Sequence, residues 1–342
     1  MGLAIVLMSD VGEFIIMIGV VKKRLWLLLS LMSVFLFSCS STNQIVEFKP
    51  LYNQNKLPKP DIEIEIPSLK SCTYTEDKSI RLNSTEPVVV IVHGCFSSAG
   101  RFRSLADVFA FHGQQAICFE YDDRDSLEKS SAELIDAVAT LRENVKTNQI
   151  SVIAHSQGGL IARRALIEER DNALNLENTD LSLISISAPY GGIQASSHCG
   201  STTLAILSLG LTKPICKLIT GDKYRDIHPN SNFIRSPGTL KPFVSKHIKI
   251  VTDEAGSCRR FSNEGRCLED DYVFSVEEQY QNVVDAEKSL VDIVSKAGHV
   301  EIVGDENVPP TKLIEILQQH DIMNHTSVSD VDRLKRLLGA IY

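Results

Sequence analysis

Residues 150–159 read ISVIAHSQGG, and this stretch decides the fold. The apolar run at 150–154 predicts a buried strand, and the residues from 159 to 169 predict a helix. Ser156 therefore stands on a sharp turn from strand to helix, which exposes its hydroxyl at the carboxyl edge of a sheet. So short a pattern is frequent by chance, and its position between a strand and a helix is what gives it weight.

The alternation of strands and helices continues on both sides of this stretch. The predicted strands are 88–92, 116–121, 150–154, 181–187 and 247–252, and the predicted helices begin at Ser130 and Gly159 and occupy 310–317 and 330–338. A capping box, Ser130 to Glu133, marks the start of the first helix. Wholly apolar strands are typical of sheets buried on both faces. We therefore predict an α/β fold, with a mostly parallel sheet and helices on both of its faces.

The alternation lapses between residues 191 and 246, which is long for a structureless connection. An apolar stretch at 204–219 within it is broken by Gly210 and Pro214. It is consistent with two short core helices, or with a lid-like segment whose apolar side covers a hydrophobic cleft. Both interpretations stay open from the sequence.

The composition is typical of a folded globular chain, and its acidic balance does not favour binding to nucleic acid. The 342 residues are 43% hydrophobic and 23% charged, with a formal net charge of −8. We therefore expect no nucleic-acid partner.

The N-terminal region has the pattern of an export signal. Basic residues 22–24 precede an uncharged apolar run at 25–37, which is too short to span a bilayer comfortably. We expect residues 1–38 to be a signal peptide, with translation starting at Met17, because the acidic residues before it do not suit a signal. The alternatives are an uncleaved membrane anchor, or an ordinary signal peptide in which Cys39 occurs by chance.

Leu36 to Cys39 resembles the lipobox of bacterial lipoproteins, although Phe37 is bulkier than usual. That resemblance implies lipid on Cys39 and, with Ser40 after it, an outer-membrane lipoprotein of the bacterial cell envelope. Residues 39–84 are then a tether with a short strand, and 85–342 a catalytic domain that carries the lid-like insertion at 191–246.

Eight cysteines agree with an exported, oxidising location. We predict disulfides between Cys258 and Cys267 and between Cys199 and Cys216. Zinc is the rival interpretation of the first pair, but no second pair at ligand spacing follows. The three others, Cys72, Cys95 and Cys118, leave at least one thiol that is free or paired outside the chain.

A second functional feature follows the strand at 88–92, where His93 and Gly94 open a flexible loop. Acyl-transfer chemistry needs fixed N–H donors for a developing oxygen anion. The backbone of Gln157, at the start of a helix, and that of Cys95, after His93 and Gly94, would supply them. His155 and His93 are expected to be structural.

The pieces VVVIVHGC at 88–95, AHSQGGLIARRAL at 154–166 and ISISAPYGG at 184–192 together resemble the α/β-hydrolase superfamily. The resemblance is to its lipase and PGAP1-like esterase branch, and it covers about 85–342. It implies an α/β-hydrolase fold and a catalytic serine, acid and histidine in that order along the chain.

Ser156 is then the nucleophile, and His299, in Ala297-Gly298-His299-Val300, is the expected general base. For the acid we favour Asp271, because DDYVFSVE at 270–277 resembles the D-G-V-V-P-V-E segment of lipase-like relatives. Asp253, at a strand end, and Asp270 are the alternatives.

These residues predict an exported serine hydrolase of acyl or lipid esters that needs no metal or cofactor. A short-chain esterase, a thioesterase or an acyltransferase would use the same residues. A non-catalytic envelope lipoprotein is the alternative outside enzymes.

Overall fold

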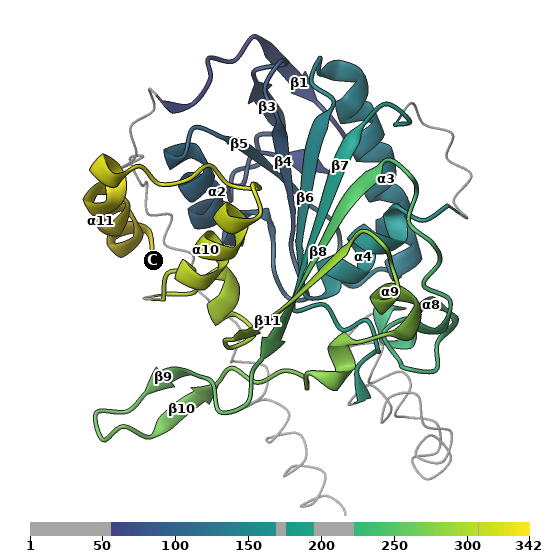
Figure 1. The fold of residues 1–342 in the computed structure, drawn as a ribbon, viewed down its shortest axis with the longest axis vertical. Helices are drawn as coiled ribbons and strands as arrows, with labels where there is room; N and C mark the ends of the chain where they lie inside the picture. Colours follow the sequence, from purple (N-terminus) through teal and green to yellow (C-terminus); the bar gives the residue numbers. More distant parts are fainter. Residues whose placement is uncertain (1–55, 169–175, 195–221, 307) are drawn as a thin grey trace, which may run out of the picture. The chain divides into compact units, whose positions relative to one another are not determined.

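The computed structural model describes residues 56–168, 176–194, 222–306 and 308–342, all within one compact unit from Pro50 to Tyr342. In these residues a seven-stranded sheet has the order β11-β8-β7-β6-β4-β5-β2 (Figure 1). Its strands are β2 (Leu69–Lys70), β4 (Val88–Val92), β5 (Gln115–Phe119), β6 (Gln149–His155), β7 (Asp180–Ile186), β8 (Val244–Asp253) and β11 (Leu290–Lys296). All neighbours are parallel except β2, which is antiparallel to β5.

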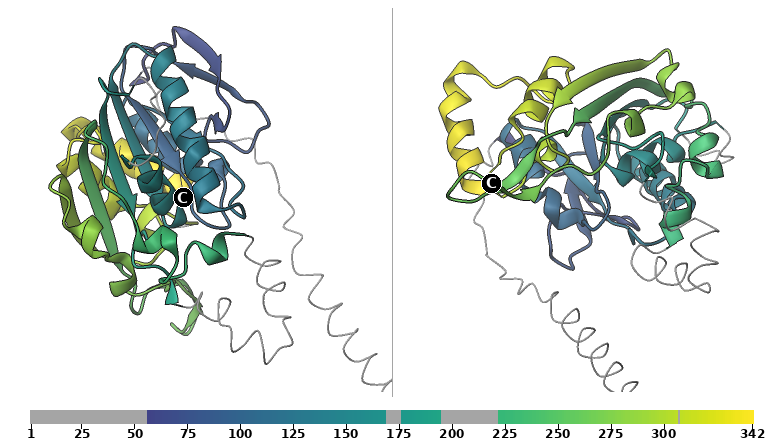
Figure 2. Two further views of the ribbon diagram at one scale, coloured as in Figure 1. Left: turned by 90° about the vertical axis from the view of Figure 1, so that its right-hand side faces the viewer. Right: turned by 90° about the horizontal axis from the view of Figure 1, so that it is seen from below.

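The five predicted strands are therefore confirmed as β4 to β8. Their central residues are buried because both faces of the sheet are covered, as Figure 2 shows. One face packs on α3 (Leu127–Asn144) and α4 (Gln157–Ala165), and the other on α2 (Arg103–Phe111), α10 (Thr311–Gln319) and α11 (Val331–Ile341). The α/β fold with helices on both faces is confirmed.

Helix α3 begins earlier than the capping box predicts. Ser126 is its N-cap, and the Ser126 hydroxyl accepts the N–H of Lys129. Ser130 and Ser131 are buried within the helix, and the Ser131 hydroxyl donates to the Leu127 carbonyl. The capping prediction at Ser130 is wrong because a serine in a helix can also bond back to its own preceding turn.

Residues 56–84 are part of the same packed structure. Strands β1 (Ile62–Glu65) and β3 (Ser79–Leu82) form an antiparallel pair, and Ile80 and Leu82 are buried in the core. A disulfide joins Cys72 to Cys118 of β5. The predicted boundary at residue 85 therefore does not coincide with the edge of the packed structure.

Strands β9 (Cys258–Phe261) and β10 (Cys267–Asp270) form a hairpin that projects from the rest of the domain (Figure 1). The predicted Cys258–Cys267 disulfide closes it, so these thiols are not available to zinc. Cys95 is a free thiol. Cys199 and Cys216, and the apolar stretch of the predicted lid, lie outside the described residues, as does Cys39.

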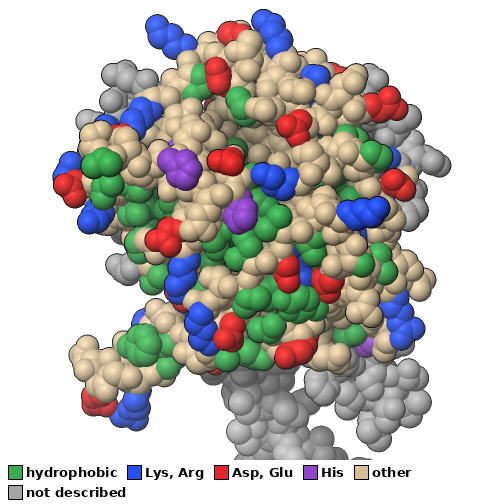
Figure 3. Space-filling view, in the orientation of Figure 1, with side chains coloured by type: hydrophobic (Ala, Val, Ile, Leu, Met, Phe, Trp, Pro, Cys, Tyr) green, Lys and Arg blue, Asp and Glu red, His purple; other side chains and the backbone are tan. Residues whose placement is uncertain are grey.

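Within the described residues, no helix has the length and apolar character needed to cross a bilayer. The insertion is described at 191–194 and from 222 onward, where η4 (Asp222–Arg225) and α8 (Asn232–Arg235) lead back to β8. Acidic and basic side chains are interspersed over the face shown in Figure 3.

Candidate active site

Ser156 lies on a strained turn between β6 and α4. Its φ of 56° and ψ of −126° are uncommon for a residue with a side chain, and its N–H donates to the Ile186 carbonyl at 2.8 Å. The surrounding sheet and helix hold this conformation. The sequence prediction of a sharp strand-turn-helix bend at Ser156 is confirmed.

Glycines around the turn allow its close packing. A Cβ on Gly158 would lie 2.4 Å from the His93 carbonyl oxygen, and one on Gly159 would lie 2.6 Å from the Ala188 side chain. A Cβ on Gly94 would lie 3.0 Å from the Cβ of Ser156. The loop after β4 therefore packs directly against the turn that carries the serine.

His299 lies in the loop between β11 and η6 (Glu301–Val303), and its Nε2 is 3.0 Å from the Ser156 hydroxyl. The structure therefore brings together Ser156 and His299, the serine and histidine that the sequence predicts as partners. The His155 ring holds the loop, because its Nε2 donates to the His299 carbonyl at 2.9 Å. Burial lowers the pKa of His155 to about 3, so its ring is neutral and places no positive charge beside His299.

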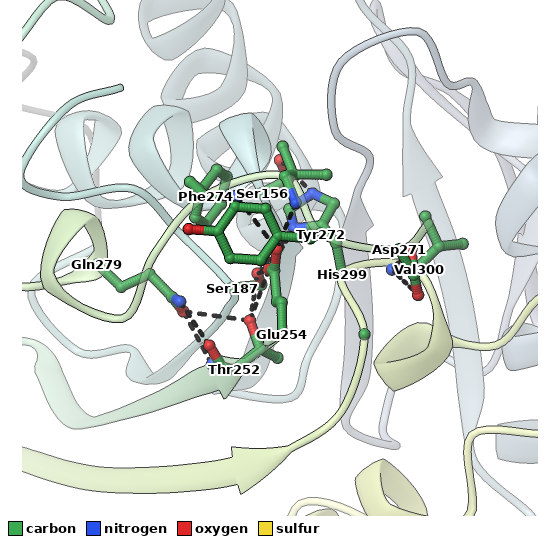
Figure 4. Close-up of polar contacts among 12 residues, drawn as sticks. Ser156, Ser187, Thr252, Glu254, Asp271, Tyr272, Phe274, Gln279, His299 and Val300 are labelled. Carbon is green, nitrogen blue, oxygen red and sulfur yellow. Dashed lines mark hydrogen bonds and ion pairs between the residues drawn. The ribbon is translucent and has the colours of Figure 1, made fainter. Parts of the chain in front are cut away.

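The carboxylate that reaches His299 belongs to Glu254, which follows β8. Its Oε1 is 2.8 Å from Nδ1 of His299, on the opposite side of the ring from Ser156 (Figure 4). Glu254 is 1% exposed. A serine hydroxyl, an imidazole and a buried carboxylate thus form one continuous hydrogen-bonded chain, which is the arrangement that activates a serine nucleophile.

The remaining lone pairs of Glu254 are occupied. Its Oε2 accepts the N–H groups of Val273 at 2.7 Å and Phe274 at 3.2 Å, and its Oε1 accepts the hydroxyls of Ser187 and Thr252, each at 2.9 Å. Burial alone would raise the pKa of Glu254, but the His299 ring and the Val273 N–H outweigh it, so this pKa is lowered. The carboxylate is therefore ionised and fixed in direction.

The prediction that Asp271 contacts the His299 ring is wrong. Its carboxylate accepts the N–H groups of Val300 at 3.0 Å and Glu301 at 2.9 Å, and Figure 4 shows it turned away from the ring. Its backbone carbonyl accepts the N–H of His299 at 3.0 Å. Asp271 holds the His299 loop through the backbone, and burial raises the pKa of Asp271.

The alternative acids are also directed elsewhere. Asp253 forms an ion pair with Lys296 at 3.1 Å, and the side chain of Asp253 is 41% exposed. Asp270 is the last residue of β10 and is exposed. Asp253, the alternative to Asp271, is the last residue of β8, and Glu254 is the next residue in the chain. Alternation of side chains along a strand was the signal that could have distinguished Asp253 from Glu254.

The two residues predicted to supply N–H donors are each next in the chain to a residue of the serine turn or its packing partner. Gln157 is the first residue of α4, where backbone N–H groups have no acceptor within the helix. Cys95 follows Gly94, which packs on Ser156. His93 is buried in a structural position, since its ring stacks on Tyr121 and the Tyr121 hydroxyl donates to the His93 carbonyl at 2.8 Å.

A second Ser-His-carboxylate chain lies elsewhere in the sheet. The Ser185 hydroxyl is 3.0 Å from Nε2 of His247, whose Nδ1 is 2.7 Å from Glu287. Ser185 and His247 are both 0% exposed, whereas Ser156 is 8% exposed at a sheet edge. Of these two chains in the described residues, the one that contains Ser156 has the more exposed serine. Among the described residues, no group of His, Cys, Asp and Glu is placed to hold a metal ion.

Comparisons with known proteins agree with this architecture. A family model described as palmitoyl protein thioesterase matches residues 87–248, slightly less than half of the chain, and this range includes Ser156 but neither Glu254 nor His299. No curated protein matches the sequence.

Solved structures similar to this chain include the propeptide form of the Bacillus licheniformis lipase BlEst2, with a TM-score of 0.50, 14% identity and coverage of 79% of this chain and 56% of that chain. The mature form of the same lipase gives a TM-score of 0.48 at 15% identity, covering 78% of this chain and 100% of that one. Esterase B from Lactobacillus rhamnosis, inhibited by a tributyrin phosphonate, gives a TM-score of 0.44 at 13% identity. The match covers 76% of this chain and 87% of that chain.

At such identities the likeness concerns the fold. The parallel sheet, the strained serine turn after β6 and the histidine after β11 occur here in one consistent order. The chain has the α/β-hydrolase fold.

Proposed function

We propose that the protein is a serine hydrolase that cleaves acyl esters through a covalent acyl-enzyme. One observation carries the proposal, namely the hydrogen-bonded chain from Ser156 through His299 to Glu254. The roles are nucleophile for Ser156, general base for His299 and orienting carboxylate for Glu254.

In the first step the Ser156 oxygen attacks the acyl carbonyl carbon while its proton passes to Nε2 of His299. The N–H groups of Cys95 and Gln157 stabilise the resulting oxygen anion. Glu254 accepts a hydrogen bond from Nδ1–H of His299 and stabilises the imidazolium, and the proton stays on the ring. His299 then protonates the leaving group, and a water activated by His299 hydrolyses the acyl-enzyme.

For the substrate we propose a carboxylic ester of an acyl chain or lipid, as the apolar stretch of the insertion suggests. A thioester is the second candidate, and the match to a family model described as palmitoyl protein thioesterase favours it. A short-chain esterase and an acyltransferase share the same chemistry. A non-catalytic envelope protein is less favoured, because it has no need of an intact Ser-His-Glu chain.

We further propose that the protein is exported and anchored by lipid on Cys39 in the bacterial envelope, at the outer membrane. Two disulfides, Cys72–Cys118 and Cys258–Cys267, support an oxidising compartment. Detergent partitioning of the wild type against Cys39→Ser tests the anchor, and equal partitioning would contradict it.

A fluorophosphonate probe tests the catalytic claim, because it reacts only with an activated serine. We expect labelling of the wild type, and loss of labelling in Ser156→Ala and His299→Ala. Ser185→Ala is the matched control, since it removes a serine from the buried Ser-His-carboxylate chain, and its labelling should remain. A folded wild type that does not react would overturn the proposal.

Rates on p-nitrophenyl esters and acyl thioesters of increasing chain length then separate the substrate classes. A rise in kcat/KM with acyl length supports a lipid or long-acyl substrate. A decline beyond short chains supports a short-chain esterase instead, and a preference for thioesters over matched esters supports the thioesterase.

A further inference from the structure

Lys223 is a buried cation in η4, within the insertion and next to the loop that carries Cys95. The side chain of Lys223 is 1% exposed. Its Nζ lies 2.8 Å from the Cys95 sulfur, 3.2 Å from the Asp123 carboxylate and 4.7 Å from the centre of the Phe96 ring. A lysine is rarely buried so deeply unless its charge is compensated, and Asp123 provides that compensation.

Asp123 links the two residues that are the proposed oxyanion donors. The Asp123 carboxylate accepts the N–H of Phe96, and so fixes the peptide that follows Cys95. The Asp123 backbone carbonyl accepts the side-chain amide of Gln157 at 3.2 Å. Phe96 has a φ of 54°, a conformation that a bulky residue keeps only when its surroundings impose it. The contact with Asp123 is one such restraint.

This restraint has an electrostatic cost. The Asp123 carboxylate places a negative charge at the Phe96 N–H, one residue after the proposed Cys95 donor. Like charges at short range in a poorly solvated site raise the energy of the transition state. The Lys223 ammonium forms an ion pair with the Asp123 carboxylate and offsets its negative charge. Its contact with the Cys95 sulfur also holds the residue whose N–H is the proposed donor.

We propose that Lys223 is a positioning residue of the oxyanion site, which holds the Cys95–Phe96 loop and neutralises Asp123. This inference rests on the proposed serine hydrolase function. The energetic benefit arises mainly when the anion is present, so Lys223 should affect kcat far more than KM.

The test compares Lys223→Met with Lys249→Met. Lys249 is the matched control, because it is also buried, at 2% exposure, and also has carboxylate partners in Asp285 and Asp292 and an aromatic ring in Tyr280. For Lys223→Met we expect fluorophosphonate labelling and kcat to fall about 10- to 100-fold with little change in KM. Lys249→Met should lower Tm and leave the labelling rate of the folded enzyme unchanged.

Two further variants separate charge compensation from simple packing. In Asp123→Asn the amide oxygen still accepts the Phe96 N–H, and labelling should be at least as fast as in the wild type. Adding Asp123→Asn to Lys223→Met should recover most of the lost rate, since no uncompensated carboxylate remains. If Lys223→Met does not fold, Asp123→Asn is compared with the double variant, and labelling should be slower in the double variant because it lacks the cation.

The outcomes distinguish this inference from the function on which it rests. A labelled wild type with Lys223→Met labelled at the same rate overturns the role of Lys223 and leaves the hydrolase intact. Equal loss of labelling in Lys223→Met and Lys249→Met, or no recovery in the double variant, also overturns it. An unlabelled, folded wild type overturns both proposals.

Discussion

Asp253 and Glu254 are neighbours in the chain but have opposite environments. Asp253 points outward to Lys296, while Glu254 is turned inward and surrounded by donors. A carboxylate that orients an imidazole must be fixed in direction and kept ionised. The N–H groups of Val273 and Phe274 fix the direction of Glu254, and the His299 ring and the Val273 N–H lower its pKa.

Replacing Glu254 by Gln should therefore lower kcat about 10³-fold or more, because the amide no longer stabilises the imidazolium. Asp253→Asn should change kcat less than about 3-fold, since it loses only an exposed ion pair. Steady-state kinetics on one ester, with Tm measured in parallel, decide the point. Equal effects of the two changes would contradict the assignment of Glu254.

At the scale of elements, the two disulfides cross-link segments that differ in their contribution to the stability of the fold. Cys72–Cys118 closes a segment with a sequence separation of 46 and joins the chain before β3 to the buried strand β5. Cys258–Cys267 closes only the β9–β10 hairpin, with a separation of 9. The entropy that a cross-link removes from the unfolded chain grows with the length of the closed loop.

We therefore expect Cys72→Ala/Cys118→Ala to lower the free energy of unfolding by about 4 kcal/mol, and Cys258→Ala/Cys267→Ala by about 3 kcal/mol or less. The hairpin lies at the periphery, so its opening need not unfold the sheet. Urea unfolding monitored by circular dichroism measures both values. A larger loss for the hairpin pair would show that the hairpin contributes to the core.

For the whole molecule, neutral histidines buried in several elements govern the response to acid. Burial lowers the pKa of His93 after β4, of His155 in β6 and of His247 in β8. For His155 the folded value is about 3. The unfolded chain thus binds more protons below about pH 6.5, so stability is fully present above that pH and is lost as pH falls through this window.

We expect Tm to fall between pH 6.5 and pH 4, and His155→Gln, whose amide can still donate to the His299 carbonyl, to reduce that fall. Each such histidine contributes at most about 1.4 kcal/mol per pH unit. Asp107 opposes this trend, because burial raises its pKa to about 6 and its protonated form stabilises the fold as pH falls below that value. Calorimetry at four pH values tests this, and an unchanged slope in His155→Gln would contradict it.

Local patterns in the sequence determined much of the architecture and half of the site. Apolar runs located β4 to β8, because burial on both faces leaves a signature within five to seven consecutive residues. Small residues around Ser156 located the sharp strand-turn-helix bend, since its steric needs lie within one short segment. The pairing of Ser156 with His299 followed from the resemblance to the α/β-hydrolase superfamily, which implies a serine, an acid and a histidine in that order.

Only the tertiary structure decided which carboxylate contacts His299, the Cys72–Cys118 pair and the position of Lys223 beside Cys95. Each depends on contacts between residues distant in the sequence, and on the side to which a loop turns its side chains. Three carboxylates near the ends of β8 and β10 were chemically equivalent candidates, and the inward turn after Asp253 selected Glu254, which the sequence alone did not single out. Periodicity within an element fixes its buried face, whereas the packing of separate elements fixes which polar groups meet.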